Sequence, residues 1–100
     1  MKENFRDENI DFLIRSILAL ETEEECFNFF CDLCTVTELQ SISQRLVVAK
    51  MLSDKEVYSD IVKKTKASTA TISRVNRALN YGEDGYRIVI DKLGRELCDE

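Results

Sequence analysis

Basic side chains gather in one window of this 100-residue chain, although the whole chain has a net charge of −5. Residues 55–80 have a net charge of +4, because six basic side chains occur there with two carboxylates. Residues 1–40 have a net charge of −7, from three basic and ten acidic side chains. Charges more than about 8–10 Å apart are largely screened in salt, so a polyanion responds to the local patch. The positive net charge of residues 55–80 is therefore compatible with binding to phosphate.

The same window has the pattern of two short helices joined by a tight turn. The first helix would span residues 57–65 and the second residues 69–79, and Ser68 or Thr69 would supply the hydroxyl that caps the second helix. The apolar side chains expected to face inward are Ile61, Val62, Ile72, Val75 and Leu79. We predict a helix-turn-helix over residues 57–79.

The outer face of the second helix would carry short hydroxylic side chains at its start and arginines further along. A major groove about 12 Å wide admits such a helix, and Thr and Ser hydroxyls can donate to or accept from base edges. Lysines before the turn and the helix N-terminus suit phosphates. We predict base contacts from Thr69, Ala70, Thr71, Ser73, Arg74 and Arg77, and phosphate contacts from Lys63, Lys64, Lys66 and Ser68. The pattern favours a sequence-specific regulator that binds double-stranded DNA, and a purely structural helical corner is the alternative.

The rest of the chain has the composition of an all-α protein with one domain over residues 1–100. Proline is absent and glycine occurs three times, whereas sheet proteins need turn residues roughly every 8–12 positions. Two capping boxes, Thr22 with Glu25 and Thr35 with Glu38, mark the starts of a second and a third helix. We expect about six helices. The third would carry an apolar stripe of Leu39, Ile42, Leu46, Ala49 and Leu52.

A glycine-containing loop separates the helix-turn-helix from the last helix. Residues 80–85 form the clearest loop of the chain, and glycine there would supply the positive φ that such loops often need. The last helix would then run over residues 84–98. Tyr81 and Tyr86 flank the glycines, and we expect them to pack this helix against the core. A small-molecule pocket bordered by the two tyrosines is the alternative.

The first two helices are very apolar for so small a protein. Apolar patches of this extent usually mark a partner surface, and DNA operators commonly mirror a protein two-fold axis. We therefore predict a homodimer with its dimerisation helices in residues 1–54, and an oversized monomer core is the alternative. The residues concerned are Phe5, Ile10, Phe12, Leu13, Ile14, Ile17, Leu18, Phe27, Phe29 and Phe30.

Four cysteines could carry other chemistry, since Cys31-x-x-Cys34 with Cys26 and Cys98 has ligand types that suit zinc. A redox dithiol is a second possibility. However, Cys26 and Cys31 fall in an apolar helix, free cysteine is among the most buried residue types, and a second CxxC is missing. We therefore expect packing and no metal site. A protein-interaction or metal-responsive module that uses this region is the alternative function.

Several classes of protein are disfavoured by what the chain lacks. Histidine is absent, which removes the commonest general acid or base, and no P-loop, dinucleotide-binding or nucleophile-elbow motif occurs. We expect no enzymatic activity. No stretch approaches the ~20 apolar residues of a membrane span, and the N-terminal residues are too charged for a secretory signal. A cytoplasmic protein with reduced cysteines and no membrane partner is expected.

Residues 32–93 resemble the Trp repressor superfamily, and most closely its YerC/YecD-like branch. The resemblance is carried by Leu33-Cys34-Thr35 with Thr37-Glu38, by Arg45, by Ser68-Thr69-Ala70-Thr71-Ile72-Ser73-Arg74, by Leu79-Asn80-Tyr81-Gly82 and by Gly85-Tyr86-Arg87. It implies an all-helical, intertwined dimer with a core shared between the N-terminal helices of both chains. It also implies a repressor in preference to an activator.

The resemblance further implies a corepressor pocket at Thr35, Arg45, Arg74 and Val75. In Trp repressor two arginines enclose the indole, and they match Arg45 and Arg74. The glycine that follows the second arginine is Val75 here, and a branched side chain occupies volume that glycine leaves to an aromatic ring. We predict no cofactor and no binding of free tryptophan, with any other effector unidentified. Lys66 also departs from the glycine that is usual in the turn, at a cost on the order of 1 kcal/mol if its backbone is left-handed.

Overall fold

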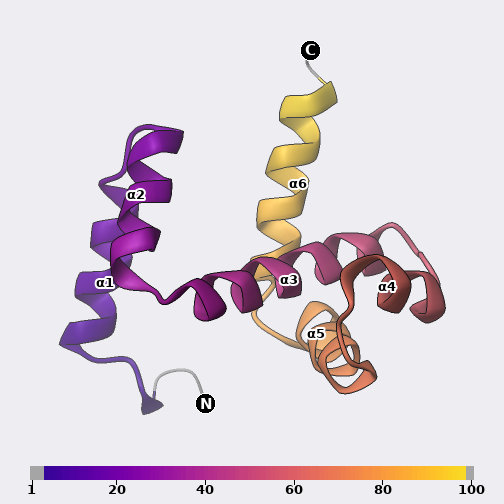
Figure 1. Cartoon of the computed structure of the whole chain (residues 1–100). Coiled ribbons are helices and arrows are strands. Elements are labelled where there is room, and N and C mark those ends of the chain that lie inside the picture. Colours follow the sequence, from indigo (N-terminus) through magenta and orange to yellow (C-terminus); the bar gives the residue numbers. More distant parts are fainter. Residues whose placement is uncertain (1–3, 99–100) are drawn as a thin grey trace. The chain divides into compact units, whose positions relative to one another are not determined.

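The computed structural model describes residues 4–98, with side chains for residues 4–95. The regular elements of this part of the chain are helices (Figure 1), so the predicted all-α fold with six helices is confirmed. By their internal contacts they form two compact units, Met1–Leu39 and Gln40–Glu100. The helices are α1 (Glu8–Leu18), α2 (Glu23–Leu33), α3 (Val36–Ser53), α4 (Tyr58–Thr65), α5 (Thr69–Tyr81) and α6 (Gly85–Cys98).

The first unit contains two helices whose starts are fixed by side-chain caps. The Asp7 carboxylate accepts a hydrogen bond from the Ile10 N–H (2.9 Å), and the Thr22 hydroxyl accepts one from the Glu25 N–H (3.1 Å). The Glu25 carboxylate in turn accepts from the N–H of Glu21 (3.0 Å). These bonds satisfy donors that the start of a helix leaves unpaired. The cap predicted at Thr22 is confirmed.

The apolar side chains of α1 and α2 are left largely uncovered within the chain. Neither helix has a buried residue. Phe29 and Phe30 pack edge to face with ring centroids 5.6 Å apart, whereas Phe12 is 68% exposed and Leu18 is 77% exposed. Apolar surface of this kind is typical of a face that meets a partner.

Thr35 and Glu38 form the second predicted capping box, at the start of α3. The Thr35 hydroxyl accepts from the Glu38 N–H (3.1 Å), and the Glu38 carboxylate accepts from the Thr35 N–H (2.8 Å). The hydrogen bond from the Thr35 backbone is the main cause that lowers the pKa of Glu38 below its ordinary value. The Thr35 side chain lowers that pKa further, while desolvation acts in the opposite direction.

The second unit has a hydrophobic core of its own, built where α3, α4 and α5 meet. Tyr86 and Ile90 of α6 pack against this core, as do Leu52 and Val62. Its buried members are Val48, Ala49, Met51, Ile61, Ala67, Ile72 and Val75. The helix-turn-helix is thus supported from inside by α3 and from one side by α6.

The buried face of α3 differs from the face that the sequence predicted. Of the predicted stripe only Ala49 is buried, whereas Ile42 and Leu46 are each 41% exposed. Val48 and Met51 lie in the core instead. Apolar residues surround much of this helix, so their periodicity alone could not distinguish the side that meets α4 and α5 from the side that stays open.

The segment between α5 and α6 also differs from the prediction. Helix α5 continues to Tyr81, and Gly82 follows with φ −91° and ψ −144°. A Cβ at Gly82 would collide with the carbonyl oxygen of Ala78. The left-handed residue is Asp84, with φ 64°, and no glycine of the described chain has a positive φ. The prediction that glycine supplies the positive φ was therefore wrong, since Gly82 is needed for close backbone approach and Asp is among the residues that tolerate the left-handed region.

The two tyrosines beside this segment behave differently. Tyr86 is half-buried and packs against the core of the second unit, as expected. Tyr81 is 85% exposed, so the expectation that it packs α6 against the core was wrong. Tyr81 lies two residues after Leu79, which places it on the face of α5 opposite the buried stripe.

Candidate nucleic-acid interface

Helices α4 and α5 form the predicted helix-turn-helix. Helix α4 ends at Thr65, and Lys66 then takes a left-handed backbone with φ 64° and ψ 12°. A side chain in this region costs on the order of 1 kcal/mol. The Thr65 hydroxyl stabilises the turn, because it donates to the carbonyl oxygen of Ile61 (2.7 Å) and accepts from the N–H of Ala67 (3.1 Å).

The turn is also attached to α3, through a polar contact and an apolar one. Gln44 donates from Nε2 to the carbonyl oxygen of Thr65 (3.1 Å). Ala67 is 2% exposed and belongs to the hydrophobic core. The angle at which α5 leaves the turn is thus fixed from inside the unit, as a helix that enters a groove requires.

The first turn of α5 is capped by Ser68, one of the two residues predicted for this role. The Ser68 hydroxyl accepts from the Thr71 N–H (3.1 Å) and donates to Thr71 Oγ1 (3.0 Å). The inner face of the helix is buried through Ile72, Val75 and Leu79, as predicted. The cap and the buried stripe together determine which side chains remain on the outer face.

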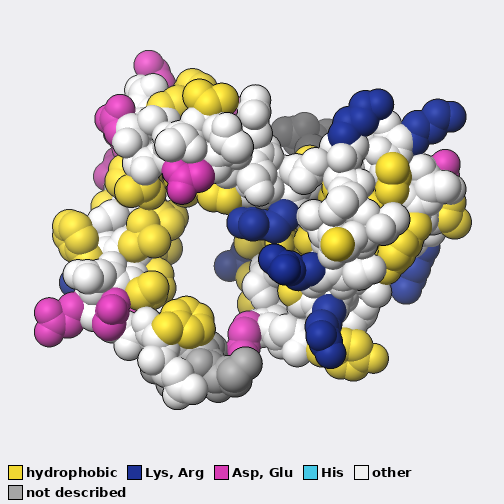
Figure 2. All heavy atoms as spheres, turned by 60° about the horizontal axis from the view of Figure 1, so that its bottom comes forward, with side chains coloured by type: hydrophobic (Ala, Val, Ile, Leu, Met, Phe, Trp, Pro, Cys, Tyr) yellow, Lys and Arg dark blue, Asp and Glu magenta, His cyan; other side chains and the backbone are white. Residues whose placement is uncertain are grey.

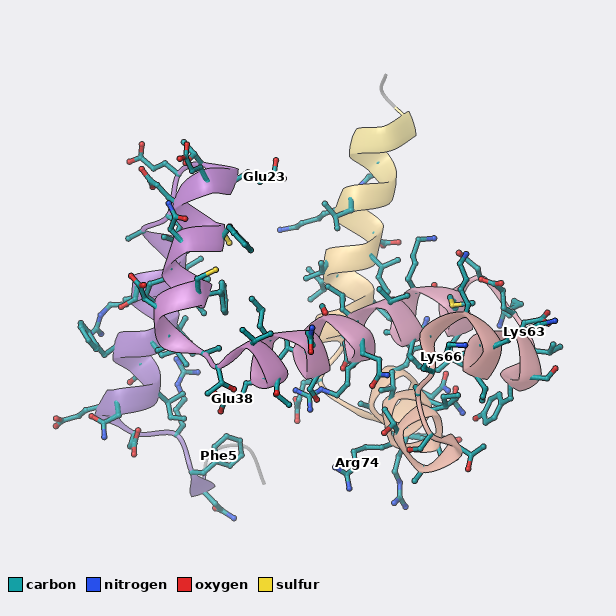
Figure 3. All side chains as sticks on the ribbon, viewed as in Figure 1. Phe5, Glu23, Glu38, Lys63, Lys66 and Arg74 are labelled. Carbon is teal, nitrogen blue, oxygen red and sulfur yellow. The ribbon has the colours of Figure 1, made fainter. Side chains whose placement is uncertain are left out.

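The outer face of α5 carries most of the residues predicted to contact bases. Thr71 is half-buried, and its hydroxyl interacts with the Ser68 cap. Arg74 points away from the core in Figure 3. The exposed residues are Thr69, Ala70, Ser73, Arg74 and Arg77. The structure thus places short side chains at the start of this face and arginines further along it.

The lysines predicted to contact phosphates lie at the end of α4 and in the turn. Lys63 and Lys64 are exposed in the last turn of α4, and Lys66 is exposed in the turn that follows. Figure 3 labels Lys63 and Lys66. The first turn of α5 contains no acidic residue. In Figure 2 the basic side chains gather on the second unit, while acidic side chains mark the first. Positive charge therefore lies beside the positive end of the α5 dipole, and both favour a polyanion.

The residues of the implied effector pocket have different surroundings. The Thr35 hydroxyl caps α3, and Arg45 and Arg74 are exposed on α3 and α5. Val75 is 2% exposed and packs in the hydrophobic core. A pocket at these residues stays a prediction, and Val75 would contribute to it from within the core.

The cysteines do not form a metal site in the described part of the chain. Cys26 and Cys34 are half-buried, Cys31 is exposed, and the Cys98 side chain lies outside the described residues. Within this chain the packing expected of the cysteines is therefore not seen at Cys31. Among the described residues, no three His, Cys, Asp or Glu side chains come together as metal ligands would. In the same residues no helix is both long and apolar enough to cross a membrane.

Asn80 and Arg87, for which no role was predicted, make polar contacts at the other end of α5. Arg87 donates from Nε to the carbonyl oxygen of Leu79 (3.0 Å) and from Nη2 to Asn80 Oδ1 (3.0 Å). Both residues occur in the motifs that carry the family resemblance. That occurrence was the available signal, but only the fold brings them together across seven positions.

Comparisons with known proteins identify the family to which the chain belongs. A capped helix with an exposed polar face, supported by a packed first helix and a basic turn, is the arrangement of the helix-turn-helix DNA-binding regulators. The family model of the Trp repressor protein matches residues 8–94. The chain belongs to the Trp repressor family, which is a family of regulators and not of enzymes.

Individual relatives agree with this assignment. The uncharacterized protein YerC of Bacillus subtilis (strain 168) is 50% identical over 91 residues, which cover 91% of this chain and 88% of that protein. Two solved structures each have a TM-score of 0.88 and 50% identity. One is a Staphylococcus aureus protein that is provisionally named a Trp repressor. The match covers 92% of this chain and 92% of that protein. The other, a TrpR-like protein from Eubacterium eligens ATCC 27750, is covered to 95% by 92% of this chain. The resemblance to the YerC-like branch is thereby confirmed.

Proposed function

We propose that this chain is a sequence-specific transcriptional repressor that acts as a homodimer and reads the major groove of DNA with α5. The observation that carries the proposal is the outer face of α5. It is held outward by a buried inner face and begins at a side-chain cap beside exposed lysines. A helix in the major groove contacts base edges mainly through its N-terminal residues. The binding needs no cofactor and no catalytic group.

Base recognition is proposed for the side chains of the first three turns of α5. Thr69 and Ser73 present exposed hydroxyls, Ala70 presents a methyl group, and Arg74 and Arg77 present exposed guanidinium groups. Hydroxyls can contact any base edge, a methyl group suits thymine, and arginine suits guanine. Thr71 has a narrower role in this proposal. Because its hydroxyl accepts from Ser68, its methyl group and the remaining capacity of the hydroxyl would face the base.

Phosphate contacts are proposed for the end of α4 and the turn. Lys63, Lys64 and Lys66 would neutralise backbone charge without regard to sequence. The Ser68 hydroxyl is occupied by its two bonds to Thr71. Ser68 would thus contribute mainly by holding the first turn of α5 in place, so that the backbone N–H groups there point at a phosphate.

The homodimer is proposed from apolar surface in both units. The first unit leaves large side chains exposed, including Phe12 and Leu18. In the second unit a groove between α3 and α6 is lined mainly by apolar residues: Leu46, Val47, Val89, Ile90 and Leu93. Burial of such surfaces against a second copy would remove them from water at a gain of about 25 cal/mol per Å². A two-fold assembly would also present two copies of α5 to the two halves of an operator.

Free tryptophan is proposed not to be the corepressor. Val75 adds a branched side chain where the resemblance places glycine, and that side chain is packed in the core. Calorimetric titration of the purified protein with tryptophan should give no saturable heat. Saturable binding in the micromolar range would contradict this part of the proposal and leave the DNA-binding part unchanged.

Selection from DNA tests the main proposal directly. Purified protein is mixed with a random-sequence duplex pool and with fragmented genomic DNA, and the bound fragments are sequenced after several rounds. A palindromic motif should emerge, and its binding should weaken steeply with salt. No enriched motif would overturn the proposal. Stoichiometric zinc in the same protein would then favour a metal-responsive module that uses Cys31 and Cys34.

A further inference from the structure

The C-terminal end of α5 receives a cation from the next helix. Its own last turn contains no basic residue. Arg87 lies in the first turn of α6, and its Nε donates to the carbonyl oxygen of Leu79 at 3.0 Å. Carbonyl groups at the end of a helix lack partners within the helix, and a positive charge near them is favourable. Arg87, which lies outside α5, therefore supplies a hydrogen-bond donor and a positive charge to the C-terminal end of that helix.

Asn80 extends this contact along α5. Its Oδ1 accepts from Arg87 Nη2 (3.0 Å), while its Nδ2 donates to the carbonyl oxygen of Asn76 (2.9 Å) and to Asn76 Oδ1 (3.0 Å). We call these contacts of Arg87, Leu79, Asn80 and Asn76 the Arg87 bridge. The bridge reaches the middle of α5 at Asn76, whose neighbours in the sequence are the buried Val75 and the exposed Arg77.

The α6 end of the bridge is held by packing. Tyr86, the preceding residue, and Ile90, three residues further on, both pack against the core. The backbone can fold back in this way because Gly82 lies against Ala78, where a Cβ would collide. Arg87 thus starts from a supported position, and its planar fork can satisfy two acceptors at once, which lysine cannot do.

We infer that Arg87 is a positioning residue for DNA recognition: through the Arg87 bridge it fixes the C-terminal half of α5 to α6, and so sets the direction in which the outer face of α5 points. This inference rests on the proposed DNA-binding function. It assigns Arg87 no contact with DNA. Two supports then orient α5, the Ser68 cap and turn at its start and the bridge at its end.

A pair of charge-matched variants tests the inference. Arg87→Gln removes the two hydrogen bonds that Arg87 donates in the bridge, whereas Arg95→Gln removes the same charge from an exposed position further along α6. The probe is the duplex motif enriched in the selection above. Arg87→Gln should weaken its binding by about fivefold or more, because each of the two lost hydrogen bonds contributes on the order of that factor. The slope of binding against salt should stay unchanged, and Arg95→Gln should bind as the unmodified protein does.

Other outcomes would overturn the inference. Equal weakening by both variants would show a general charge effect, and a salt slope reduced by about one unit in Arg87→Gln would show a direct phosphate contact. Unchanged binding by Arg87→Gln would show that the bridge is irrelevant to recognition. Arg87→Lys should restore only part of the affinity, and full restoration would contradict the requirement for a fork.

Two further measurements keep the test decisive. Asn80→Ala breaks the contact between Asn80 and Arg87 without a change of charge, and it should also weaken binding. This variant therefore tests the inference if Arg87→Gln fails to fold. Amide hydrogen exchange tests the bridge without DNA. The Gly82 N–H, which bonds to Ala78 (2.9 Å), should exchange faster in Arg87→Gln than in Arg95→Gln. If the unmodified protein selects no DNA motif, the proposed function fails, whereas the exchange result still reports on the bridge itself.

Discussion

The two units of this protein use apolar residues in opposite ways. In the second unit Val48, Ile61 and Ile72 are fully buried in a core that the chain supplies by itself. In the first unit α1 and α2 have caps and apolar faces, but they bury no residue. A segment can therefore be a capped helix with an apolar face without contributing a buried residue to a core. Caps and periodicity determine where a helix begins and which of its faces is apolar, whereas a core needs a second surface of matching shape.

Charge divides the molecule in a similar way. The acidic residues of the first unit include three in the first turn of α2, Glu23, Glu24 and Glu25, where the helix dipole favours them. In the second unit, the end of α4 and the turn carry Lys63, Lys64 and Lys66, and α5 carries Arg74 and Arg77. A net charge of −5 for the whole chain therefore conceals a locally basic surface.

The largest expected effect comes from the core of the second unit. Ile72→Ala should lower the free energy of unfolding by about 2–5 kcal/mol, because Ile72 is fully buried and its truncation leaves a cavity. Urea titration followed by tyrosine fluorescence measures it, since Tyr58, Tyr81 and Tyr86 all lie in the second unit. Phe12→Ala in the first unit is the control. Equal losses in both variants would show that the units do not differ in this respect.

A second prediction concerns the exposed apolar faces of the first unit. Leu18→Glu should weaken dimerisation about thirtyfold or more, because loss of a central apolar contact costs about 2 kcal/mol. Sedimentation equilibrium over a range of concentrations measures the dissociation constant. Glu23→Gln, a polar change in the same unit, should leave it unaltered. If the unmodified protein sediments as a monomer, the proposal that a second copy of the chain covers these faces is contradicted.

A third prediction separates two roles within the second unit. Lys63→Ala should weaken binding to all duplexes and reduce the salt slope by about one unit. Thr69→Val keeps the shape of the side chain but removes the hydroxyl, so it should change base preference by about 1–3 kcal/mol at one position. Binding of the selected motif and of single-base variants at several salt concentrations measures both. Identical behaviour of the two variants would contradict the division of roles.

The smallest expected effect is the pH dependence from Glu38. Hydrogen bonds from Thr35 lower the pKa of Glu38 in the folded protein, so the stabilisation is present above the unfolded pKa. It is lost as the pH falls through the lowered folded value. NMR titration of the carboxyl group should show the low pKa, and Thr35→Ala should return it toward the ordinary range. Unchanged titration in Thr35→Ala would refute the stated cause.

The sequence by itself determined the helices, three of their caps and the location of the helix-turn-helix. Thr22, Thr35 and Ser68 could be identified as caps because capping depends on residues within one turn of each other. The stripe of Ile72, Val75 and Leu79 was correct for a similar reason. A short helix with few apolar residues has only one face that it can bury. The family resemblance also followed from the residues themselves.

The tertiary structure decided which face is buried where several faces are apolar, and which distant residues meet. Helix α3 packs through Val48 and Met51, although Ile42 and Leu46 fit the helical period equally well. The contact of Arg87 with Leu79 and Asn80 depends on the path of the chain at Gly82 and Asp84. Local preferences fix a helix, but the choice among its faces depends on surfaces supplied by other parts of the chain.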